Sequence, residues 1–282
     1  MILVFGKTGQ VARELQQLGR VKALGREDAN LSDPQACAGA IRHHSPDVVI
    51  NAAAYTAVDQ AENEEAVATV INGDAPTAMA KVCAELGIPF LHISTDYVFE
   101  GTGQAPWQPQ DQTAPQNAYG RSKLAGETGI ADSSGTYAIL RTSWVVSSHG
   151  ANFIKTMLRL SETRDALNIV GDQIGGPTPA HDIALACLKI AEQLIQDTSK
   201  SGTYHFSGAP DVSWADFANE IFDKAGKSVA VTPIPTTDYP TPAQRPLNSR
   251  MDCTGTKRAF GIERPDWVTG LKTILDDLEV ST

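Results

Sequence analysis

The stretch MILVFGKTGQVA, residues 1–12, decides the fold. Its apolar run from Ile2 to Phe5 ends at a glycine and leads into an apolar-periodic segment, which predicts a fully buried strand followed by a helix. Gly6 and Gly9, in a G-x-x-G-x-x-A pattern, permit a tight turn and let a pyrophosphate approach the helix N-terminus. An ordinary strand-to-helix turn is the alternative, but the position at the first such junction favours dinucleotide binding.

Working outward from this turn, the first half of the chain alternates strands with helices. Asp33 is the expected N-cap of one helix and Gly87 the expected C-cap of another. Further strands are predicted at 21–24, 47–51, 88–93 and 137–140, helices at 61–70 and 75–86, and a loop at 101–116 before the helix that carries Tyr119. This alternation predicts an α/β fold with a Rossmann-type, doubly wound parallel sheet.

Past Trp144 the pattern is less regular and contains no repeat. Helices are predicted at 152–160, 180–194, 213–225 and from 266, strands at 167–170, 204–206 and 229–234, and a proline-rich loop at 235–249. We expect residues 1–147, with about 180–206, to form an NAD(P)-binding domain. Residues 148–179 and 207–282 should form a smaller interleaved α/β lobe that binds substrate, with the ligand cleft between the two.

Composition narrows the class of protein. The chain has 282 residues, of which 41% are hydrophobic, enough to bury a full core. The net charge of −10 disfavours nucleic acid and anionic membranes as partners. The N-terminal apolar run lacks a basic region and is too short for a signal peptide or a membrane span. Well-separated cysteines without a C-x-x-C pattern indicate buried thiols in the cytoplasm: Cys37, Cys83, Cys187 and Cys253.

A Tyr-x-x-x-Lys element points to proton transfer. Tyr119 and Lys123 are four residues apart, so on a helix they share one face. A nearby positive charge lowers the pKa of a phenol and suits it to acid–base work near neutral pH, although a surface pair is the simpler alternative. Thr95, at the end of the fourth strand, could hold a substrate carbonyl for protonation by Tyr119, or could merely cap the strand.

The end of the second strand bears on the cofactor. Gly25-Arg26 offers no acid for a ribose 2′-hydroxyl, whereas an arginine can meet a 2′-phosphate, so NADPH is favoured over NADH. Glu27 or Asp28 could still reach the ribose, and Arg26 could be a solvated loop charge. The small side chains of Ala53 and Ala54, after the third strand, leave room for the cofactor.

These residues, in this order, resemble the extended short-chain dehydrogenase/reductase family. Within it, segments along essentially the whole chain resemble the dTDP-4-dehydrorhamnose reductases: NAAAYTAVDQAE (51–62), STDYVFEGTG (94–103), YGRSKLAGE (119–127), RTSWV (141–145), NFIKTMLRL (152–160), DQIGGPT (172–178) and YPTPAQRPLNSRMD (239–252). The resemblance implies reduction of the C4 ketone of dTDP-4-dehydro-β-L-rhamnose by NADPH or NADH. This would be the last step towards dTDP-β-L-rhamnose, a precursor of cell-surface polysaccharide such as the O-antigen of lipopolysaccharide.

The resemblance also implies roles for individual residues. Tyr119 would be the proton donor, Lys123 its pKa partner and ribose anchor, and Thr95 the carbonyl-orienting group. Residues that would line the cofactor, besides Tyr119 and Lys123, are Gly6, Gly9, Gln10, Val11, Arg26, Asn30, Leu31, Ala53 and Ala54. Residues that would contact the sugar, besides Thr95, are Thr56, Val58, Asp96, Tyr97 and Trp144. The two aromatic residues could instead belong to the core, but a deoxysugar has an apolar face that needs such a wall.

The sequence departs from this family in two places. The acid that often ends the second strand is absent. In some members Mg²⁺ is thought to join two subunits through acidic ligands, and Glu14 and Asp277 fall near such positions. His181 stands where a third carboxylate is expected, and imidazole suits a hard cation poorly. The sequence thus does not decide whether the protein binds Mg²⁺ or whether it is a monomer or a homodimer. Without a metal, Glu14 is expected to be a solvated helix residue.

Two other functions remain as alternatives. One is another nucleotide-sugar reductase or epimerase; a dehydratase is disfavoured because Asp96 is followed by Tyr97 rather than by a second acid. The other is a non-catalytic, NADP-binding regulatory subunit, which an intact Thr95, Tyr119 and Lys123 set disfavours. The adjacent pair His43-His44 has no third ligand in sight and is expected at the surface.

Overall fold

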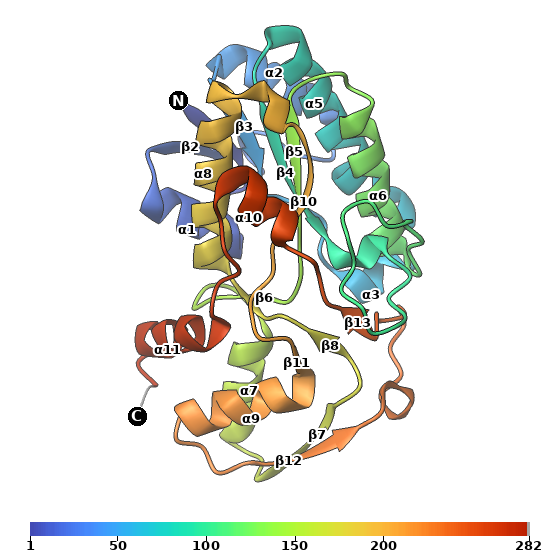
Figure 1. Ribbon diagram of the computed structural model, residues 1–282, viewed down its shortest axis with the longest axis vertical. Coiled ribbons are helices and arrows are strands. Elements are labelled where there is room, and N and C mark those ends of the chain that lie inside the picture. Colours follow the sequence, from blue (N-terminus) through green and yellow to red (C-terminus); the bar gives the residue numbers. More distant parts are fainter. Residues whose placement is uncertain (281–282) are drawn as a thin grey trace.

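A computed structural model describes residues 1–280; residues 281 and 282, the end of the expected second lobe, lie outside the described residues. The molecule is elongated (Figure 1), with a sheet and its helices in the upper part and a smaller lobe below. The N-terminus lies beside the sheet, and the last helix lies against the lower lobe. No helix within residues 1–280 is long and apolar enough to cross a membrane.

The main sheet has six strands in the order β10-β5-β4-β3-β1-β2. Its members are β1 (Ile2–Phe5), β2 (Val21–Leu24), β3 (Val48–Asn51), β4 (Phe90–Thr95), β5 (Tyr137–Thr142) and β10 (Gly202–His205). Every neighbouring pair is parallel, which confirms the Rossmann-type sheet. The chain order reverses between β1 and β3, and ligands of such sheets bind in the crevice outside the carboxyl ends of the strands at this point.

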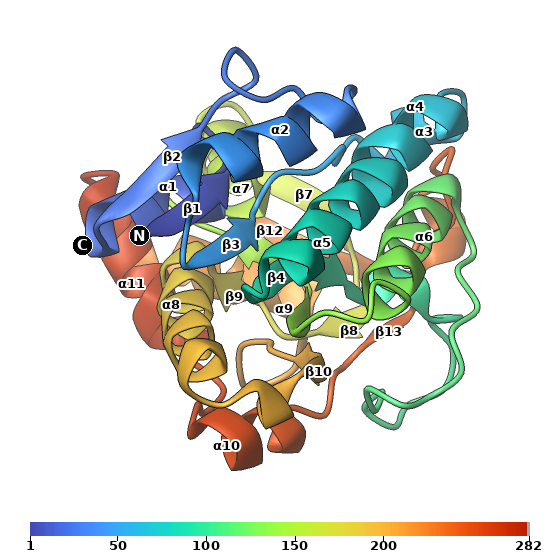
Figure 2. The same ribbon diagram turned by 90° about the horizontal axis from the view of Figure 1, so that it is seen from above.

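Helices cover both faces of this sheet, as Figure 2 shows from above. One face packs against α1 (Gln10–Leu18) and α8 (Ala180–Gln196), the other against α2 (Pro34–His44), α5 (Ala75–Leu86) and α6 (Ala118–Ala131). Within β1, Val4 belongs to the first of these cores and Leu3 to the second. The continuous apolar run at the start of the sequence follows from this burial on both faces.

The caps expected from the sequence are confirmed, but one helix is broken. Asp33 Oδ1 accepts hydrogen bonds from the N–H groups of Gln35 and Ala36, and Gly87 ends α5 at a φ of 68°. The helix-rich stretch predicted at 61–70 is helical, but it is interrupted. The structure has α3 (Val58–Ala61), α4 (Glu65–Thr69) and a π turn, η1 (Val70–Asp74).

The π turn has a local cause in Asn72. Its Oδ1 accepts from the N–H of Tyr55 at 2.8 Å, and its Nδ2 donates to the carbonyl of Tyr55 at 3.0 Å and to Ser122 Oγ at 2.9 Å. One extra residue in the turn aims this side chain inward, and such bulges are common beside functional sites. Asn72 therefore joins the segment after β3 to α6.

The lower lobe has its own core. It contains α7 (Phe153–Ser161), α9 (Trp214–Lys224) and α11 (Trp267–Asp277), with a parallel strand pair, β7 (Ala166–Val170) and β12 (Ala230–Ile234). Their apolar faces meet around Phe217, whose ring lies 5.1 Å from that of Trp267.

The remaining short elements were not predicted. They are β6 (Val145–Val146), β8 (Ile174–Gly175), β9 (Thr178–Pro179), β11 (Val212–Ser213), β13 (Asn248–Ser249), α10 (Thr254–Phe260) and the 3₁₀ turns η2 (Asp96–Val98), η3 (Thr198–Lys200) and η4 (Thr236–Asp238). A two-residue strand has no periodicity to detect. The side chain of Phe260, on α10, packs into the core shared by the main sheet and α8.

Candidate active site

The turn after β1 is shaped to receive an anion. Gly6 has a φ of 116°, and a Cβ there would stand 3.3 Å from the carbonyl carbon and oxygen of Ala52. Gly9 caps α1 with no side-chain hydrogen bond to the helix. The N–H groups of the first helical turn are therefore free to bind a phosphate, at the end where the helix dipole favours negative charge.

Gln10 and Val11 begin α1 but point in different directions. Val11 is buried in the core beneath the sheet. Gln10 Oε1 accepts from Ser147 Oγ at 2.7 Å and from Asn152 Nδ2 at 3.0 Å. The Gln10 side chain thus holds the segment that leads from the sheet into the lower lobe.

No acid ends β2 itself, but Glu27 and Asp28 lie in the turn that follows it, as the alternative reading of this segment allowed. The chain turns back so that Asp28 Oδ2 accepts from the N–H of Gly25 at 2.9 Å. The Glu27 carboxylate lies over Gly25, 2.5 Å from where a Cβ would stand, and accepts a hydrogen bond from Lys7 Nζ at 3.0 Å. Arg26 is exposed beside them. Both chemistries, a carboxylate and a guanidinium, therefore stand where the adenosine ribose of a dinucleotide would lie.

Asn30, Leu31, Ala53 and Ala54 flank the same edge of the sheet. Asn30 is exposed and its Oδ1 accepts from the N–H of Ser32, while Leu31 packs against the core under α2. Ala53 and Ala54 follow β3 and are half-buried. The structure thus brings these residues to the crevice between the carboxyl ends of β1, β2 and β3.

Thr95 and Tyr119 come together at the carboxyl end of β4. Thr95 Oγ1 donates to Asp96 Oδ1 at 3.1 Å and accepts from the N–H of Tyr97 at 3.2 Å. The rings of Tyr97 and Tyr119 meet edge to face with centroids 5.5 Å apart. A Cβ at Gly120 would collide with the carbonyl oxygen of Tyr97, so glycine there allows α6 to lie against η2. Thr95 thus caps the turn after β4, and its side chain also lies within hydrogen-bonding reach of Tyr119.

The phenol of Tyr119 is held in its protonated form. Burial raises its pKa to about 12, and the neighbouring Thr95 side chain lowers it by less. Lys123 makes no contribution to this shift, contrary to the expectation, because its amine is directed elsewhere. Its Nζ donates to the carbonyl of Ile93 at 2.7 Å and lies 2.9 Å from His92 Nε2.

Lys123 is buried and lies close to a buried ion pair, which Glu127 and Arg141 form. Burial lowers the pKa of Lys123 to about 8, against the opposite effect of Glu127. Glu127 Oε2 lies 2.6 Å from Nη2 of Arg141, and its Oε1 accepts from Ser94 Oγ at 2.5 Å. Sequence reasoning missed Glu127 and Arg141, because nothing in their spacing reveals that both are inside.

Three polar oxygens near Thr95 have no hydrogen-bond partner among the described residues. They are Asp96 Oδ2, Thr142 Oγ1 and Ser249 Oγ. Burial raises the pKa of Asp96 to about 6. Thr142 lies opposite Thr95 in the register of β4 and β5. The Ser249 side chain is nevertheless close enough to Asp96 to lower that pKa as a hydrogen-bond donor, so these two groups can pair with each other. Buried polar groups are normally paired, so Thr142 Oγ1 is the oxygen that points to a ligand. Sequence reasoning found Asp96 but not Thr142 or Ser249.

Trp144 forms an aromatic wall between the two parts of the molecule. Its φ is 49°, a left-handed conformation that is rare in residues other than glycine. Residues with such a conformation are found most often at functional sites. Its ring stacks on that of Trp214 with centroids 3.5 Å apart, and a Cβ at Gly175 would stand 2.9 Å from Trp144 Cε2. Of the other predicted sugar contacts, Thr56 is exposed, and Val58 begins α3, which packs against α6.

Glu14 is buried, which corrects the expectation of a solvated helix residue. Its Oε1 lies 3.2 Å from His149 Nε2 and its Oε2 lies 3.2 Å from His181 Nδ1. Asp277 instead accepts from Ser148 Oγ at 3.2 Å. Across residues 1–280, no group of three or more His, Cys, Asp or Glu side chains is placed to hold a metal ion. An arrangement of one carboxylate between two imidazoles does not fit Mg²⁺.

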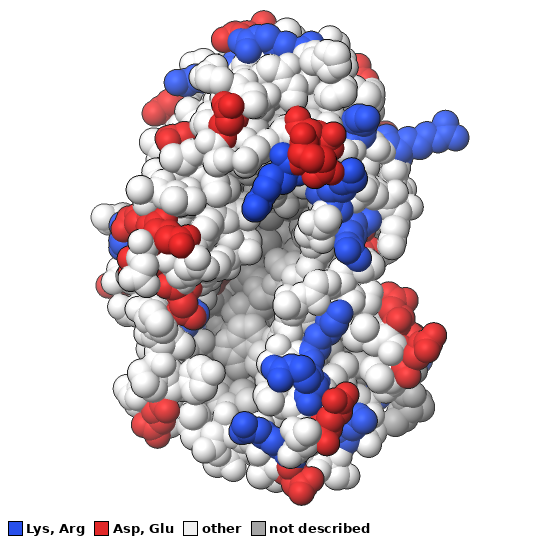
Figure 3. All heavy atoms as spheres, turned by 180° about the vertical axis from the view of Figure 1, so that it is seen from behind, with Lys and Arg blue, Asp and Glu red and all other residues white. Residues whose placement is uncertain are grey.

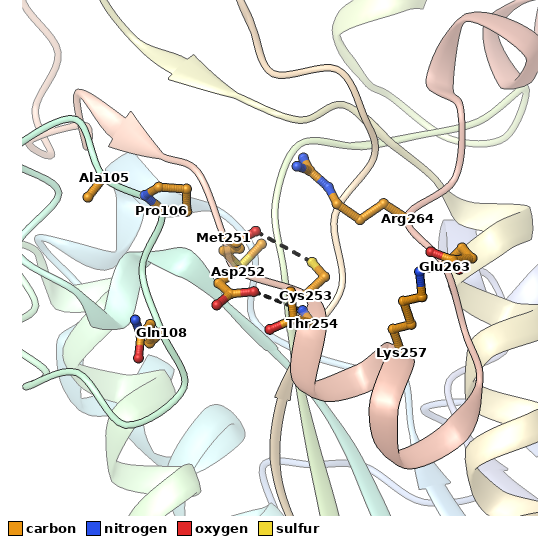
Figure 4. Close-up of a pocket in the computed structure, with 10 residues that line it drawn as sticks. All are labelled: Ala105, Pro106, Gln108, Met251, Asp252, Cys253, Thr254, Lys257, Glu263 and Arg264. Atoms are coloured by element: carbon orange, nitrogen blue, oxygen red, sulfur yellow. Dashed lines mark hydrogen bonds and ion pairs between the residues drawn. The ribbon is translucent and has the colours of Figure 1, made fainter.

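The surface has a hollow and a separate pocket. Figure 3 shows the hollow between the upper and lower parts, with Lys and Arg side chains along one rim, which suits an anionic ligand despite the net charge of −10. Figure 4 shows the pocket, about 490 Å³, between residues 105–108 and α10. None of the predicted site residues lines it.

The adjacent histidine pair that the sequence placed at the surface is only partly exposed. His43 is exposed, and His44 is half-buried beside it.

A doubly wound sheet that brings a threonine and a tyrosine together at its carboxyl edge places this chain among the extended short-chain dehydrogenases/reductases. Over residues 1–280 the chain matches the family described as RmlD substrate binding domain, and it belongs to that family.

Relatives and solved structures agree with this assignment. The dTDP-4-dehydrorhamnose reductase of Sinorhizobium fredii is 44% identical over 94% of this chain and 93% of the relative, and that of Salmonella typhimurium 41% identical over 100% and 99%. The crystal structure of a dTDP-4-dehydrorhamnose reductase from Clostridium acetobutylicum has a TM-score of 0.91 at 36% identity, covering 99% of both chains. That of Bacillus anthracis in complex with NADP has a TM-score of 0.90 at 33% identity, covering 98% of both.

Proposed function

We propose that this protein is an NAD(P)H-dependent oxidoreductase that reduces the C4 ketone of dTDP-4-dehydro-β-L-rhamnose to dTDP-β-L-rhamnose, the last step of dTDP-L-rhamnose biosynthesis. The observation that carries this proposal is the full-length similarity to relatives named for this reaction. It is supported by the protonated Tyr119 beside Thr95 at the carboxyl edge of the sheet.

The residues present fit a nicotinamide dinucleotide. Gly6 lies where a side chain would fill the space against Ala52, and the free N–H groups after Gly9 would bind the pyrophosphate. Gln10, Val11, Asn30, Leu31, Ala53 and Ala54 would line the rest of the cofactor. We propose NADPH as the preferred form, held at its 2′-phosphate by Arg26, because Lys7 already pairs with the Glu27 carboxylate and offsets its charge. NADH would also bind, since Asp28 and Glu27 are near.

When bound, the reduced nicotinamide would supply the hydride. Thr95 would orient the ketone oxygen through its hydroxyl, and Tyr119 would give that oxygen its proton. The raised pKa of Tyr119, about 12, keeps the phenol protonated until the oxygen develops negative charge. Lys123 would anchor the cofactor ribose from the same face of α6.

The sugar would lie between the sheet and the lower lobe. Trp144 and Tyr97 would cover its apolar face, and Asp96, which is buried beside Thr95, would meet a hydroxyl. Thr56 and Val58 would complete the contacts. In this division residues 1–147 with about 180–206 hold the cofactor and supply these sugar contacts, and residues 148–179 with 207–282 form the other side of the sugar site.

The wider setting is also proposed. The partner is a dTDP-linked 4-keto-6-deoxysugar, not nucleic acid or a membrane, and the protein is a monomer or homodimer. Because NADPH and nucleotide sugars are cytoplasmic metabolites, we place the enzyme in the cytoplasm.

One assay tests the proposal. The protein is mixed with dTDP-4-dehydrorhamnose and NADPH, nicotinamide absorbance is followed, and the sugar product is identified by NMR. We expect one NADPH oxidised per sugar reduced at C4. Cofactor that binds but is not oxidised in the presence of the sugar would overturn the assignment.

A further inference from the structure

The indole of Trp144 is held between Trp214 and Gly175. One face of the indole stacks on the Trp214 ring, with the centroids 3.5 Å apart and the ring planes within 10° of each other. Its Cε2 edge lies against Gly175, where an added Cβ would stand only 2.9 Å away. Trp144 is half-buried, so these contacts cover only part of its side chain, and the remainder is open to a ligand.

A three-stranded sheet places both neighbours of Trp144. In the order β11-β8-β13, Gly175 of β8 stands opposite Val212 of β11 on one side and Ser249 of β13 on the other. Trp214 follows β11 directly and begins α9. The register of this sheet therefore sets the width of the slot that receives the Trp144 ring.

Hydrogen bonds fix the orientation of the Trp214 ring. Its Nε1–H donates to Gln173 Oε1 at 3.1 Å, and Gln173 Nε2 donates to Thr236 Oγ1 at 3.2 Å. Because an indole N–H can only donate, it determines which way the Gln173 amide faces. The Thr236 hydroxyl donates its own hydrogen to Asp172 Oδ1 at 2.6 Å, which leaves the oxygen free to accept from Gln173. Trp214 thus offers Trp144 a surface of fixed orientation.

The backbone of Trp144 needs such support. A φ of 49° is costly for a residue with a side chain and persists only where the surrounding structure enforces it. The Trp144 carbonyl accepts from the N–H of Thr178 at 3.0 Å, where β6 pairs with β9. The contacts of the ring with Trp214 and Gly175 supply the second constraint.

The slot lies close to the proposed catalytic residues. A Cβ at Gly175 would also stand 2.9 Å from Ser249 Cβ. Ser249 lowers the pKa of Asp96 as a hydrogen-bond partner, and Asp96 Oδ1 accepts from Thr95 Oγ1 at 3.1 Å. A continuous set of contacts therefore leads from Trp144 to the hydroxyl that would orient the ketone.

We propose that Trp214 and Gly175 are positioning residues for the sugar, because they hold the Trp144 ring in the one place where it can cover the apolar face of the substrate. The identity of that sugar rests on the proposed function. A ring that is fixed in advance loses little side-chain freedom on binding, so more of its contact energy appears as affinity. Both residues act through Trp144, and neither needs to touch the sugar itself.

The first test detects the stacked pair in solution. Two stacked indoles couple their excited states and give far-ultraviolet circular dichroism bands of opposite sign. We expect these bands in the native protein and their loss in Trp214→Phe. Trp107→Phe is the control and should retain them, because Trp107 stacks on Phe99 rather than on another tryptophan. A native spectrum without the bands, or equal effects of the two substitutions, would overturn the inference.

The second test compares the dissociation constants of dTDP-L-rhamnose and of dTDP, which lacks the sugar, by calorimetry in the presence of NADP⁺. Gly175→Ala adds a methyl group against the Trp144 ring and leaves Trp214 unchanged. We expect the affinity for dTDP-L-rhamnose to fall by about five- to tenfold, and that for dTDP to stay within about twofold of native. Gly39→Ala is the control and should change neither constant, since a Cβ there meets no atom within 4 Å. Equal losses for the two ligands in Gly175→Ala would refute the proposal.

A double-mutant cycle shows whether the two residues act through Trp144. Once Trp144→Leu has removed the ring, Gly175→Ala and Trp214→Phe should each change dTDP-L-rhamnose binding by less than about twofold. Losses that add in full would mean that these residues act by another route, such as Ser249, and would refute the proposal. The two substitutions perturb the ring from different sides, so either one completes the cycle if the other prevents folding.

Binding and turnover separate this inference from the proposed function. Coupled losses in the cycle, in a protein that does not oxidise NADPH with dTDP-4-dehydrorhamnose, would refute the proposed function alone. Turnover of the keto sugar with additive losses in the cycle would refute the inference alone.

Discussion

Nη2 of Arg245 lies 2.8 Å from Oδ2 of Asp59, and this ion pair joins the proline-rich segment 235–249 to α3. The same carboxylate accepts from the N–H of Ala243 through Oδ1 at 3.1 Å. Asn117, the N-cap of α6, donates to the carbonyl of Gln244 at 2.8 Å. The segment is therefore attached next to Val58 and the start of the helix that carries Tyr119.

Arg245→Met should weaken substrate binding while cofactor binding is preserved. A partly exposed ion pair contributes about 1 kcal/mol or less, so we expect KM for the nucleotide sugar to rise by about fivefold. Initial-rate kinetics and cofactor titration measure the two effects. Lys257→Met, which breaks the exposed pair with Glu263, is the control and should leave both constants unchanged. An equal loss of affinity for cofactor and sugar would contradict a specific role of segment 235–249 in sugar binding.

Tyr119→Phe should abolish most turnover. General acid catalysis contributes about 10²- to 10⁴-fold, so we expect kcat to fall by roughly that factor, with the dissociation constant of NADPH within about twofold of native. Tyr204→Phe is the matched control, since Tyr204 lies on β10 at the far edge of the sheet and its hydroxyl donates to the carbonyl of Lys200. A Tyr119→Phe enzyme with native kcat would show that another group protonates the ketone.

Glu127→Gln should destabilise the fold strongly. Glu127 and Arg141 are 5% and 6% exposed, and removing one partner leaves the other charge buried, at a cost of about 3–5 kcal/mol. Urea unfolding at neutral pH measures the difference. Glu65→Gln is the comparison, because its pair with Arg121 is about half-exposed and should contribute about 1 kcal/mol or less. Equal effects of the two substitutions would contradict the role of burial.

Asp96 should make stability depend on pH. Its pKa is raised in the fold to about 6, so the stabilising, protonated form is present below the unfolded pKa and is lost as pH rises through 6. Between about pH 5 and 8 the free energy of unfolding of the native protein should fall by about 1 kcal/mol more than that of Asp96→Asn. The difference between their urea midpoints at the two pH values measures this. A constant difference would mean that Asp96 is ionised throughout.

Arg26→Asp should shift the cofactor preference towards NADH. It replaces the cation proposed to meet the 2′-phosphate by a carboxylate that repels it. The ratio of kcat/KM for NADPH to that for NADH should fall by at least about tenfold. Arg20→Asp, also exposed but before β2, is the control and should leave the ratio unchanged. If the two variants behave alike, Arg26 is only a solvated loop charge.

The sequence predicted the sheet well because its strands are buried on both faces. Runs such as Val48–Asn51 have no alternating polar residues, and the helices between them have an apolar period and recognisable caps. The interrupted helix at 58–74 could not be predicted in the same way. Its break depends on Asn72, whose hydrogen bonds are made to Tyr55 and Ser122, far along the chain.

The candidate site was predicted in part. Thr95, Tyr119 and Lys123 carry a spacing that the sequence displays, and the structure places them around the end of β4. His92, Thr142 and Ser249 have no such spacing. Their importance follows from the register of adjacent strands and from the return of β13 over the sheet, which depend on the tertiary fold.

The connection between β5 and β10 determines how the chain can fold. β10 completes the sheet next to β5, and α8 covers one sheet face, but both follow residues of α7 and β7 in the lower lobe. A fragment ending at residue 147 would expose the edge of β5 and the apolar face that α8 covers. The two parts should therefore fold cooperatively, in a single unfolding transition, and the nascent sheet remains open to aggregation until residue 205 is synthesised.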